Sequence, residues 1–224
     1  MKNITKLFLY LNLCLTLLAC SKISPKGEIE VKDVTVKNFT KLNLKGDFKV
    51  FFAKGNQNLV SVETYPNVYK NLDIEVENGI LTIEENRKTD QVDFYNITIF
   101  GKNDLNEVSL SDKVEMNVSG KVKTPEFSLH LKGNSKFMGA VIAPKSKIEM
   151  AEKSNANILG ETKNLNLKLA DSASIMAPYF YVENLEILSK NGASAGLNID
   201  QEMKGTLENT SKLIFYGEPL NKLT

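Results

Sequence analysis

Apolar and polar residues alternate over most of the chain after residue 28, and the spacing typical of amphipathic helices is scarce. A period of two is the pattern of strands that bury one face and expose the other. Glycines and other turn-forming residues separate the alternating segments. The clearest of these segments are residues 31–36, 49–52, 59–62, 74–76 and 80–83. The pattern therefore predicts an all-β chain built from short strands.

Two local signals stand out in the first third of the chain. Asn78-Gly79 lies between two alternating segments, and this dipeptide strongly favours the tight turn of an antiparallel hairpin. Residues 66–72 (PNVYKNL) form the one segment that predicts a helical turn, because proline is well tolerated in the first turn of a helix.

The second half of the chain repeats itself. Short strand-like segments are each followed by a small or polar turn, and similar turn residues recur every 18 to 20 positions. This spacing is typical of a solenoid, in which each repeat buries its apolar side chains only by stacking on its neighbours. The recurring turn residues are Ser135, Ser154, Ser172, Gly192 and Thr210.

The repeat predicts a single-stranded parallel β-helix for the residues after about Asn103. An antiparallel sandwich, the alternative, would have hairpin turns at irregular spacing and no column of equivalent turns. In the first third, the Asn78-Gly79 hairpin signal competes with the β-helix interpretation. The residues expected to point into the core are Leu129, Leu131, Met150, Leu165, Leu167, Leu169, Ile187 and Ile214.

Composition excludes several classes of protein. The 224 residues include 28 Lys and Arg against 27 Asp and Glu, so the formal charge is only +1. Such a balance provides no basic field for nucleic acid, which we do not expect as a partner. A hydrophobic fraction of 42% and a charged fraction of 25% are those of an ordinary globular chain. Disorder and multiple membrane spans are therefore excluded.

The N-terminus has the features of a lipoprotein signal peptide. Lys2 and Lys6 precede an apolar run over residues 7–18, which is too short to span a bilayer as a helix. The run ends in Leu-Leu-Ala-Cys, which looks like the lipobox of bacterial lipoproteins, with Cys20 as the lipidated residue. We therefore expect a signal peptide at residues 1–19, a lipidated tether at 20–27 and a β-helix domain at 28–224.

Lipidation would leave the mature chain without a free thiol. Cys14 would be removed with the signal peptide, and the sulfur of Cys20 would carry lipid such as palmitate, so no disulfide is expected. Several acyl chains give a stable membrane anchor. No acidic cluster follows Cys20. In related Gram-negative lineages such a cluster marks export to the surface, so we expect the periplasmic face of the outer membrane.

The mature chain resembles the "putative auto-transporter adhesin, head GIN domain" family of bacterial lipoproteins. The resemblance is carried by residues 39–50 (FTKLNLKGDFKV), 67–72, 79–83, the turn repeats and the closing segment 212–219 (KLIFYGEP). It implies a right-handed β-helix in exported, often lipid-anchored proteins, some of which pack into oligomers. Its motifs are structural and none is catalytic. Adhesion is implied by the family name.

Candidate catalytic and metal-binding residues are few. Ser194 lies in a G-x-S-x-G string, but the required helix and downstream histidine are missing. The only histidine, His130, lies between two leucines and is expected to face solvent. One histidine and no free cysteine exclude the usual zinc sites, and no calcium or phosphate-binding loop is present. We therefore expect no catalytic residue, metal or cofactor.

Three weaker features complete the sequence picture. Asp171 and Glu152 occupy neighbouring turns and are the carboxylate pair that a polysaccharide-degrading enzyme would use, although Arg87 is the only arginine. Ser172 follows Asp171 in a short motif that resembles an O-glycosylation acceptor. Adjacent aromatic residues at 51–52, 94–95, 179–181 and 215–216 must each present one ring to solvent, where it could bind sugar or a partner.

These observations favour a lipid-anchored cell-envelope β-helix that acts as a non-enzymatic binding, adhesion or scaffold module. We expect a membrane partner through the lipid and a glycan or envelope-protein ligand. Two alternatives stay open. One is a carbohydrate-active β-helix lyase or hydrolase. The other is a self-assembling envelope protein, because solenoid ends offer unpaired strand edges unless they are capped.

Overall fold

A computed structural model describes residues 22–224, so the predicted signal peptide and Cys20 lie outside the described residues. It contains 16 strands and one short helix, α2 (Pro66–Tyr69). The strands are β1 (Glu30–Thr35), β2 (Lys41–Gly46), β3 (Lys49–Lys54), β4 (Leu59–Thr64), β5 (Leu72–Glu77), β6 (Ile80–Glu85), β7 (Asn96–Gly101), β8 (Glu107–Asp112), β9 (Glu115–Lys123), β10 (Glu126–Leu131), β11 (Lys136–Met150), β12 (Asn155–Leu169), β13 (Ser174–Ser189), β14 (Ser194–Leu207), β15 (Lys212–Tyr216) and β16 (Leu220–Leu223).

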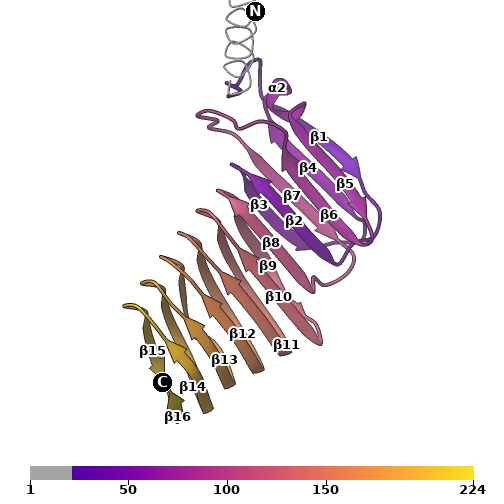
Figure 1. Ribbon diagram of the computed structural model, residues 1–224. Helices are drawn as coiled ribbons and strands as arrows, with labels where there is room; N and C mark the ends of the chain where they lie inside the picture. Colours follow the sequence, from indigo (N-terminus) through magenta and orange to yellow (C-terminus); the bar gives the residue numbers. More distant parts are fainter. Residues whose placement is uncertain (1–21) are drawn as a thin grey trace, which may run out of the picture.

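The strands stack into a β-solenoid of about six turns, which confirms the predicted fold class (Figure 1). Each long strand from β11 to β14 bends from one side of the solenoid to the other. The first face consists of β1, β4, β7, β3, β9, the first halves of β11–β14, and β15. The second face consists of β5, β6, β2, β8, β10, the second halves of β11–β14, and β16.

The core is a continuous column of apolar side chains between the two faces. Parallel pairing keeps equivalent residues of successive turns in register, as for Leu129, Ile148 and Leu167. All three side chains are fully buried. Seven of the eight residues predicted to point inward are buried, from Leu129 through Ile187. The alternating pattern therefore identified the core of the repeat region correctly.

The eighth inward prediction, Ile214, is wrong. Ile214 pairs with Gly196 and is 58% exposed, whereas Leu213 pairs with the buried Ala195 and points inward. Residues 213–216 are all apolar or aromatic, so the sequence pattern does not show which side of this strand faces the core. Since a shift of one residue exchanges the two sides of a strand, the choice between Leu213 and Ile214 could not be made locally.

One corner of the solenoid is formed by residues in the left-handed conformation, which we call the left-handed corner. Its members follow the second-face strands at equivalent positions of successive turns. They have φ angles between 58° and 73°, and they are Asp112, Gly133, Glu152, Asp171 and Asn191. Asp and Asn tolerate this conformation better than most residues, and glycine adopts it without cost. The predicted column of stacked turns is therefore confirmed.

Small buried residues follow the left-handed corner. Register makes Ser135, Ser154, Ala173, Ala193 and Ser211 equivalent. The first four are fully buried. Three of the turn residues taken as equivalent from the sequence, Ser172, Gly192 and Thr210, lie one position earlier. The physical requirement is a small side chain where the corner meets the core, and alanine meets it as well as serine.

The first third of the domain combines parallel and antiparallel pairing. β5 and β6 form the predicted hairpin, with Asn78 and Gly79 both at positive φ. α2 confirms the predicted helical turn. β1 and β4 also pair antiparallel, and β4 pairs antiparallel with β7. These strands extend both faces beyond the first turn and form the cap of the solenoid, which we define as β1, β4, β5, β6 and α2 (Figure 1).

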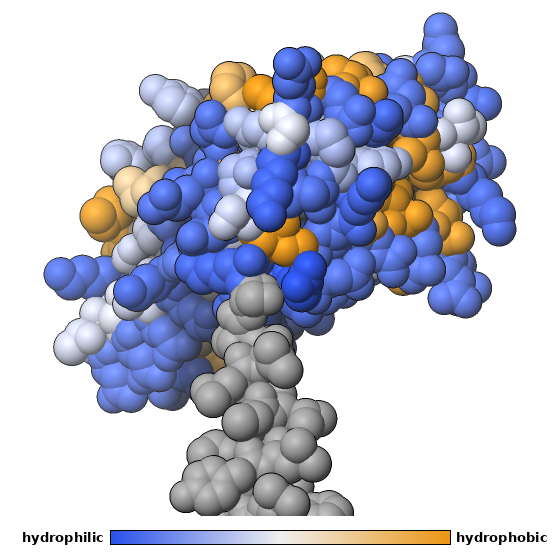
Figure 2. Space-filling model, turned by 90° about the horizontal axis from the view of Figure 1, so that it is seen from above, coloured by the Kyte–Doolittle hydropathy of each residue, from blue (hydrophilic) through white to orange (hydrophobic). Residues whose placement is uncertain are grey.

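The cap gives the solenoid a largely hydrophilic end, with hydrophobic side chains gathered in separate patches (Figure 2). A polar terminal repeat is what keeps the core of a solenoid from contact with water. The opposite end differs. Leu213 and Leu223 of the last turn are only partly buried, and Phe215, Tyr216 and Leu220 are exposed. The two ends of the solenoid are therefore chemically unlike.

The segment between residues 22 and 26 is docked on the cap. Ile23 is 92% buried and forms an isolated parallel bridge with Thr89. Its N–H donates to the carbonyl of Lys88 at 2.9 Å, and the side chain of Asn67 bonds both Lys26 N–H and the Ser24 carbonyl. The sequence indicated a polar tether here. The described part of that segment is instead fixed to the domain.

Close stacking of the turns predicts an unequal response of two glycines to substitution. Gly160 has a φ of 111°, and an added Cβ would lie 2.0 Å from the Val141 carbonyl oxygen of the preceding turn. Gly120 also has a positive φ, but an added Cβ would meet nothing within 4 Å. We expect Gly120→Ala to cost about 1 kcal/mol through backbone strain. Gly160→Ala should cost clearly more, about 3 kcal/mol or above.

Urea unfolding of the two variants, followed by circular dichroism, measures this difference. Both substitutions add the same methyl group at positive φ, so the comparison isolates the contact between turns. Equal free energies of unfolding for the two variants would contradict the stacking described for β11 and β12.

Candidate functional site

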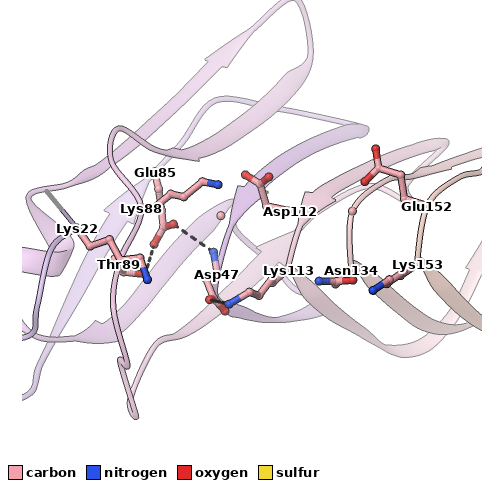
Figure 3. A pocket seen from close by; sticks show the side chains of 12 residues that line it. Lys22, Asp47, Glu85, Lys88, Thr89, Asp112, Lys113, Asn134, Glu152 and Lys153 are labelled. Carbon is pink, nitrogen blue, oxygen red and sulfur yellow. Dashed lines mark hydrogen bonds and ion pairs between the residues drawn. The ribbon is translucent and has the colours of Figure 1, made fainter. Parts of the chain in front are cut away.

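The cap and the left-handed corner enclose a hollow of about 540 Å³, which we call the corner hollow (Figure 3). Four lysines and four carboxylates line it, so its charges balance. Asp112 and Glu152 come from the left-handed corner itself, and Lys113 and Lys153 follow them in the chain. The lining charged residues are Lys22, Lys88, Lys113, Lys153, Asp47, Glu85, Asp112 and Glu152.

Several of these charges are already engaged within the protein. Lys113 Nζ lies 2.6 Å from Asp47 Oδ2, and Lys22 Nζ lies 3.1 Å from Asp90 Oδ1. Both pairs are largely exposed, so each contributes little to stability. The first pair joins the β2–β3 turn to the β8–β9 turn, and the second joins the docked segment to the loop after β6. The chemistry of this hollow is therefore suited to fastening the cap, and it offers no excess charge to an ionic ligand.

Glu85 is the most confined carboxylate of the corner hollow. Thr89 Oγ1 donates to its Oε1 at 3.0 Å, and Asp47 N–H donates to its Oε2 at 3.2 Å. Burial raises the pKa of the Glu85 carboxyl above its ordinary value, although these hydrogen bonds oppose the shift. Burial beside Glu85 likewise raises the pKa of the Tyr95 hydroxyl. A carboxyl group of raised pKa with a second carboxylate nearby is the kind of pair that glycosidases use.

The position of Glu85 has a signal in the sequence. Glu85 continues the inward phase of Leu81 and Ile83 along β6, which placed a carboxylate where a core residue belongs. The contacts of the Glu85 carboxyl nevertheless indicate a structural role. Glu85 holds Thr89 and the β2–β3 turn, while Asp47 faces Lys113.

His130 lies on the outer side of β10, as predicted. Its Nδ1 is 3.2 Å from Glu149 Oε2 on the neighbouring β11, and both side chains are about one-third exposed. Lys147 and Lys168 also approach Glu149, at 3.1 Å and 3.4 Å. Burial disfavours ionisation of Glu149, but the hydrogen bonds from the two lysines outweigh it and lower the pKa of the carboxyl. His130 is thus one of three side chains that contact Glu149 on the second face.

Ser194 has no catalytic surroundings. It lies in β14 on the first face, and its Oγ donates to Ser174 Oγ at 3.0 Å, in the equivalent position of the preceding turn. A nucleophile elbow needs a strand followed by a sharp turn and a helix. β14 instead continues to Leu207 as a strand. The G-x-S-x-G string is therefore a coincidence of turn and strand composition.

Asp171 and Glu152 lie at equivalent positions of the left-handed corner in successive turns. Both are exposed. Asn191 Nδ2 donates to Asp171 Oδ1 at 3.4 Å, and Asn209 Nδ2 donates to Asn191 Oδ1 at 3.2 Å. Asp171 is therefore the first member of a short side-chain ladder along the corner. Glu152 lines the corner hollow, whereas Asp171 does not.

Ser172 and Arg87 are both exposed. Ser172 lies beside Asp171 at the left-handed corner, where its hydroxyl is accessible, and O-glycosylation there stays a prediction. Arg87 belongs to the loop after β6. Asn71 fixes the main chain of this loop, since its amide donates to the Arg87 carbonyl at 2.6 Å and accepts from Arg87 N–H at 3.0 Å.

The aromatic pairs behave as strand alternation predicts. Phe52, Tyr95 and Phe180 are buried, while their neighbours are exposed by 45% to 65% of their surface. Phe215 and Tyr216 are both exposed because the last turn has a neighbour on one side only. A second hollow, of about 570 Å³, lies beside Tyr181 on the first face.

The described residues contain no group of three or more His, Cys, Asp and Glu side chains arranged to hold a metal ion. Between residues 22 and 224, no helix has the length and apolar character needed to cross a bilayer.

The raised pKa of Glu85 predicts a pH-dependent effect of Glu85→Gln. The folded protein keeps the proton on Glu85 to a higher pH than the unfolded chain does. Raising the pH from about 4.5 through this window therefore favours unfolding of the parent protein. Glu85→Gln removes this loss of stability, because glutamine does not ionise. We expect the stability of Glu85→Gln relative to the parent to rise with pH and then to level off, as measured by urea unfolding at a series of pH values.

Glu149→Gln is the matched control, because the pKa of Glu149 is lowered. Its carboxylate stabilises the fold above the ordinary pKa of Glu, and this contribution is lost as the pH falls through the folded-state value. The relative stability of Glu149→Gln should therefore decrease as the pH rises. The same slope for both variants would refute the different surroundings assigned to the two carboxylates.

Solved structures similar to this chain are bacterial proteins described as adhesins. A "putative adhesin" from Bacteroides fragilis is 16% identical and superposes with a TM-score of 0.72 over 90% of this chain and 100% of the other. A "putative adhesin" from Parabacteroides merdae is 14% identical, with a TM-score of 0.67 over 92% and 98%. These likenesses show a shared fold.

A third similar structure carries another description. A "putative lipid binding protein" from Parabacteroides distasonis is 15% identical, with a TM-score of 0.63 over 91% of this chain and 100% of the other. No curated protein sequence matches this chain. The model of the family described as "Putative auto-transporter adhesin, head GIN domain" matches residues 38–219. The chain therefore belongs to this adhesin-like family.

Proposed function

We propose that this protein is a lipid-anchored envelope protein whose β-solenoid acts as a non-enzymatic binding module of the adhesin type. The observation that carries the proposal is the docking of residues 22–26 on the cap, together with the position of the C-terminal turn at the opposite end (Figure 1). A domain held in this way at one end is suited to presenting its other end to a ligand.

The anchor is inferred from the basic start, the apolar run over residues 7–18 and the Leu-Leu-Ala-Cys ending. Three residues of extended chain span at most about 11 Å, which is the longest reach that the sequence allows between Ile23 and a lipid-bearing residue at position 20. Because Ile23 is held in the cap, a lipid on Cys20 would bring the cap close to the bilayer. The solenoid would then extend away from the membrane with little freedom to swing.

A binding role is supported by the family and by the form of the molecule. The family and similar structures are described as adhesins. The regular turns leave long accessible faces, and stacked repeats commonly use such faces for binding. Glu85 and Asp47 of the corner hollow already bond to protein donors and a lysine. We therefore favour binding over the carbohydrate-active enzyme.

Self-association is a second candidate, favoured by the last turn. The outer edges of β15 and β16 have no strand beside them within the described chain, and Leu213 and Leu223 are only partly covered. An unpaired edge of this kind invites a further strand. A monomeric mass by light scattering at high protein concentration would contradict this candidate.

The lipid anchor is tested by substitution of the two cysteines. Cys20→Ala should move the protein from the membrane fraction to the soluble fraction and abolish labelling by a palmitate analogue in growing cells. Cys14→Ala is the control and should leave both unchanged, because this cysteine lies within the predicted signal peptide. Membrane association and labelling that survive Cys20→Ala would contradict the anchor.

The face of the membrane and the binding role need separate measurements. Protease added to intact cells should spare the protein if it lies on the periplasmic face, and degradation would place it on the surface.

The purified domain should bind a component of an array of glycans and matrix proteins. No binding would contradict the adhesin role. Release of reducing or unsaturated ends from polysaccharides would instead support the enzyme.

A further inference from the structure

β13 interrupts the regular stacking of the solenoid on its first face. Ala177 pairs with Leu197, and the next pair is Tyr181 with Asn198. β13 thus advances by four residues where β14 advances by one. β13 therefore has three residues more than β14 at this point. It has one residue more than β12, because Ile175–Phe180 faces Ala156–Gly160. Insertions into one repeat of a solenoid commonly lie on its binding face, and bulges of this kind occur next to functional sites.

Exposed aromatic rings lie at this irregularity. Phe180 is buried, whereas Tyr179 is 65% exposed and Tyr181 is 56% exposed. Register places Tyr181, Asn198 and Tyr216 in one outward column across three successive strands. Tyr216 is 53% exposed. Since neighbouring strands lie about 4.8 Å apart, the two rings of the column are separated by about 10 Å, with an amide between them.

A hollow of about 570 Å³ lies beside Tyr181, and we call it the tyrosine hollow. Its polar lining includes Glu161, Lys163, Asn198 and Asp200. None of these four side chains forms a hydrogen bond or ion pair with another residue of the described chain. Asp200 lies in a second irregularity, where Val182 to Asn184 face Ile199 to Glu202. Both irregularities adjoin the same hollow.

We propose that the tyrosine hollow binds a neutral oligosaccharide. Sugar rings present apolar C–H faces that pack on exposed aromatic rings, and hydroxyl groups that bond to carboxylates and amides. The tyrosine hollow and its column supply both kinds of partner side by side, over a span that accommodates two successive sugar units. The proposal rests on the binding function above and names the ligand class of that function.

The charge of the tyrosine hollow selects against acidic sugars. Glu161, Glu183 and Asp200 contribute three carboxylates, and Lys163 is the only cation of its lining. A polyanionic glycan would meet net repulsion, because like charges in a shared site are unfavourable. Neutral and N-acetylated chains carry no such penalty. Their hydroxyl and amide groups instead have free acceptors and donors to bond.

The position of the tyrosine hollow agrees with its proposed use. It is formed by β11–β14, and Tyr216 belongs to β15 next to the C-terminal end. The docked segment that leads to Cys20 lies at the opposite end of the solenoid (Figure 1). A sugar bound there would be held away from the membrane by most of the length of the domain.

The test is a titration of the purified domain with chito-, manno- and xylo-oligosaccharides of four to six sugars, and with heparin and polygalacturonate as acidic probes. The protein contains no tryptophan, so its emission comes from its seven tyrosines, and the Tyr181 and Tyr216 variants identify the part of the change that these two rings contribute. At least one neutral series should bind, and the acidic probes should not. Tyr181→Ala and Tyr216→Ala should each weaken binding about tenfold or more.

Three variants separate stacking from general damage. Tyr181→Phe keeps the ring and should retain most of the affinity. Asp200→Ala should weaken binding without loss of stability, since the side chain has no partner in the described chain. Phe51→Ala should change nothing, because Phe51 is a 46% exposed aromatic residue of the same face that lies four strands from β13.

Each remaining outcome counts against the proposal in a distinct way. If the array shows binding to a protein that Tyr181→Ala leaves intact, the binding function stands and the sugar site is wrong. If no array component binds, both are wrong. If light scattering shows a dimer that Tyr216→Ala dissociates, the rings form an interface between copies. Equal binding of neutral and acidic glycans would contradict the selectivity.

Discussion

The structure depends on the burial of inward side chains between successive turns. A single turn of about 20 residues has two short strands and cannot cover its own apolar side chains, so its stability comes from the turns above and below it. Parallel register is what aligns these side chains into one column, as Leu129, Ile148 and Leu167 illustrate. The left-handed corner helps to keep this register, because it turns the chain back to the first face at the equivalent position of every turn.

The ends of the column must meet water, and the two ends do so differently. At one end the antiparallel strands of the cap, the ion pairs of the corner hollow and the docked Ile23 cover the core. At the other end the last turn is left with partly buried leucines and exposed aromatic residues. The solenoid therefore has one covered end, at the cap, and one end with exposed apolar side chains, at the last turn. This difference agrees with an anchor before the cap and a binding surface near the C-terminal end.

Function in such a fold is expected where the repeat is broken. The regular positions are occupied by residues that the stacking requires, which accounts for Ser194, Asp171 and Glu152 as turn or strand residues. The change of strand length around β13 is not needed to continue the stack, and it lies beside the exposed Tyr179 and Tyr181 and a group of unpaired polar side chains. The tyrosine hollow is therefore the part of the surface that the fold alone does not explain.

Local sequence patterns identified the repeat, the hairpin at Asn78-Gly79 and most of the core, because these features follow from strand alternation and turn chemistry. They failed where the outcome depends on distant residues. Ile23 was assigned to a tether because a lone apolar residue among polar ones gives no periodicity, and its partner Thr89 is far along the chain. The phase of β15 and the irregular register of β13 are set by pairing with neighbouring strands, which no local pattern encodes.

Hydrogen exchange followed by mass spectrometry tests the central claim most directly, because nearest-neighbour stacking predicts a gradient of local stability. Amides of β12 and β13, which have a turn on either side, should exchange slowly. Amides of β15 and β16, which have a turn on one side only, should exchange much faster. Uniform protection from β11 to β16 would contradict the account, since it would mean that the last turn is covered or that the turns do not depend on their neighbours.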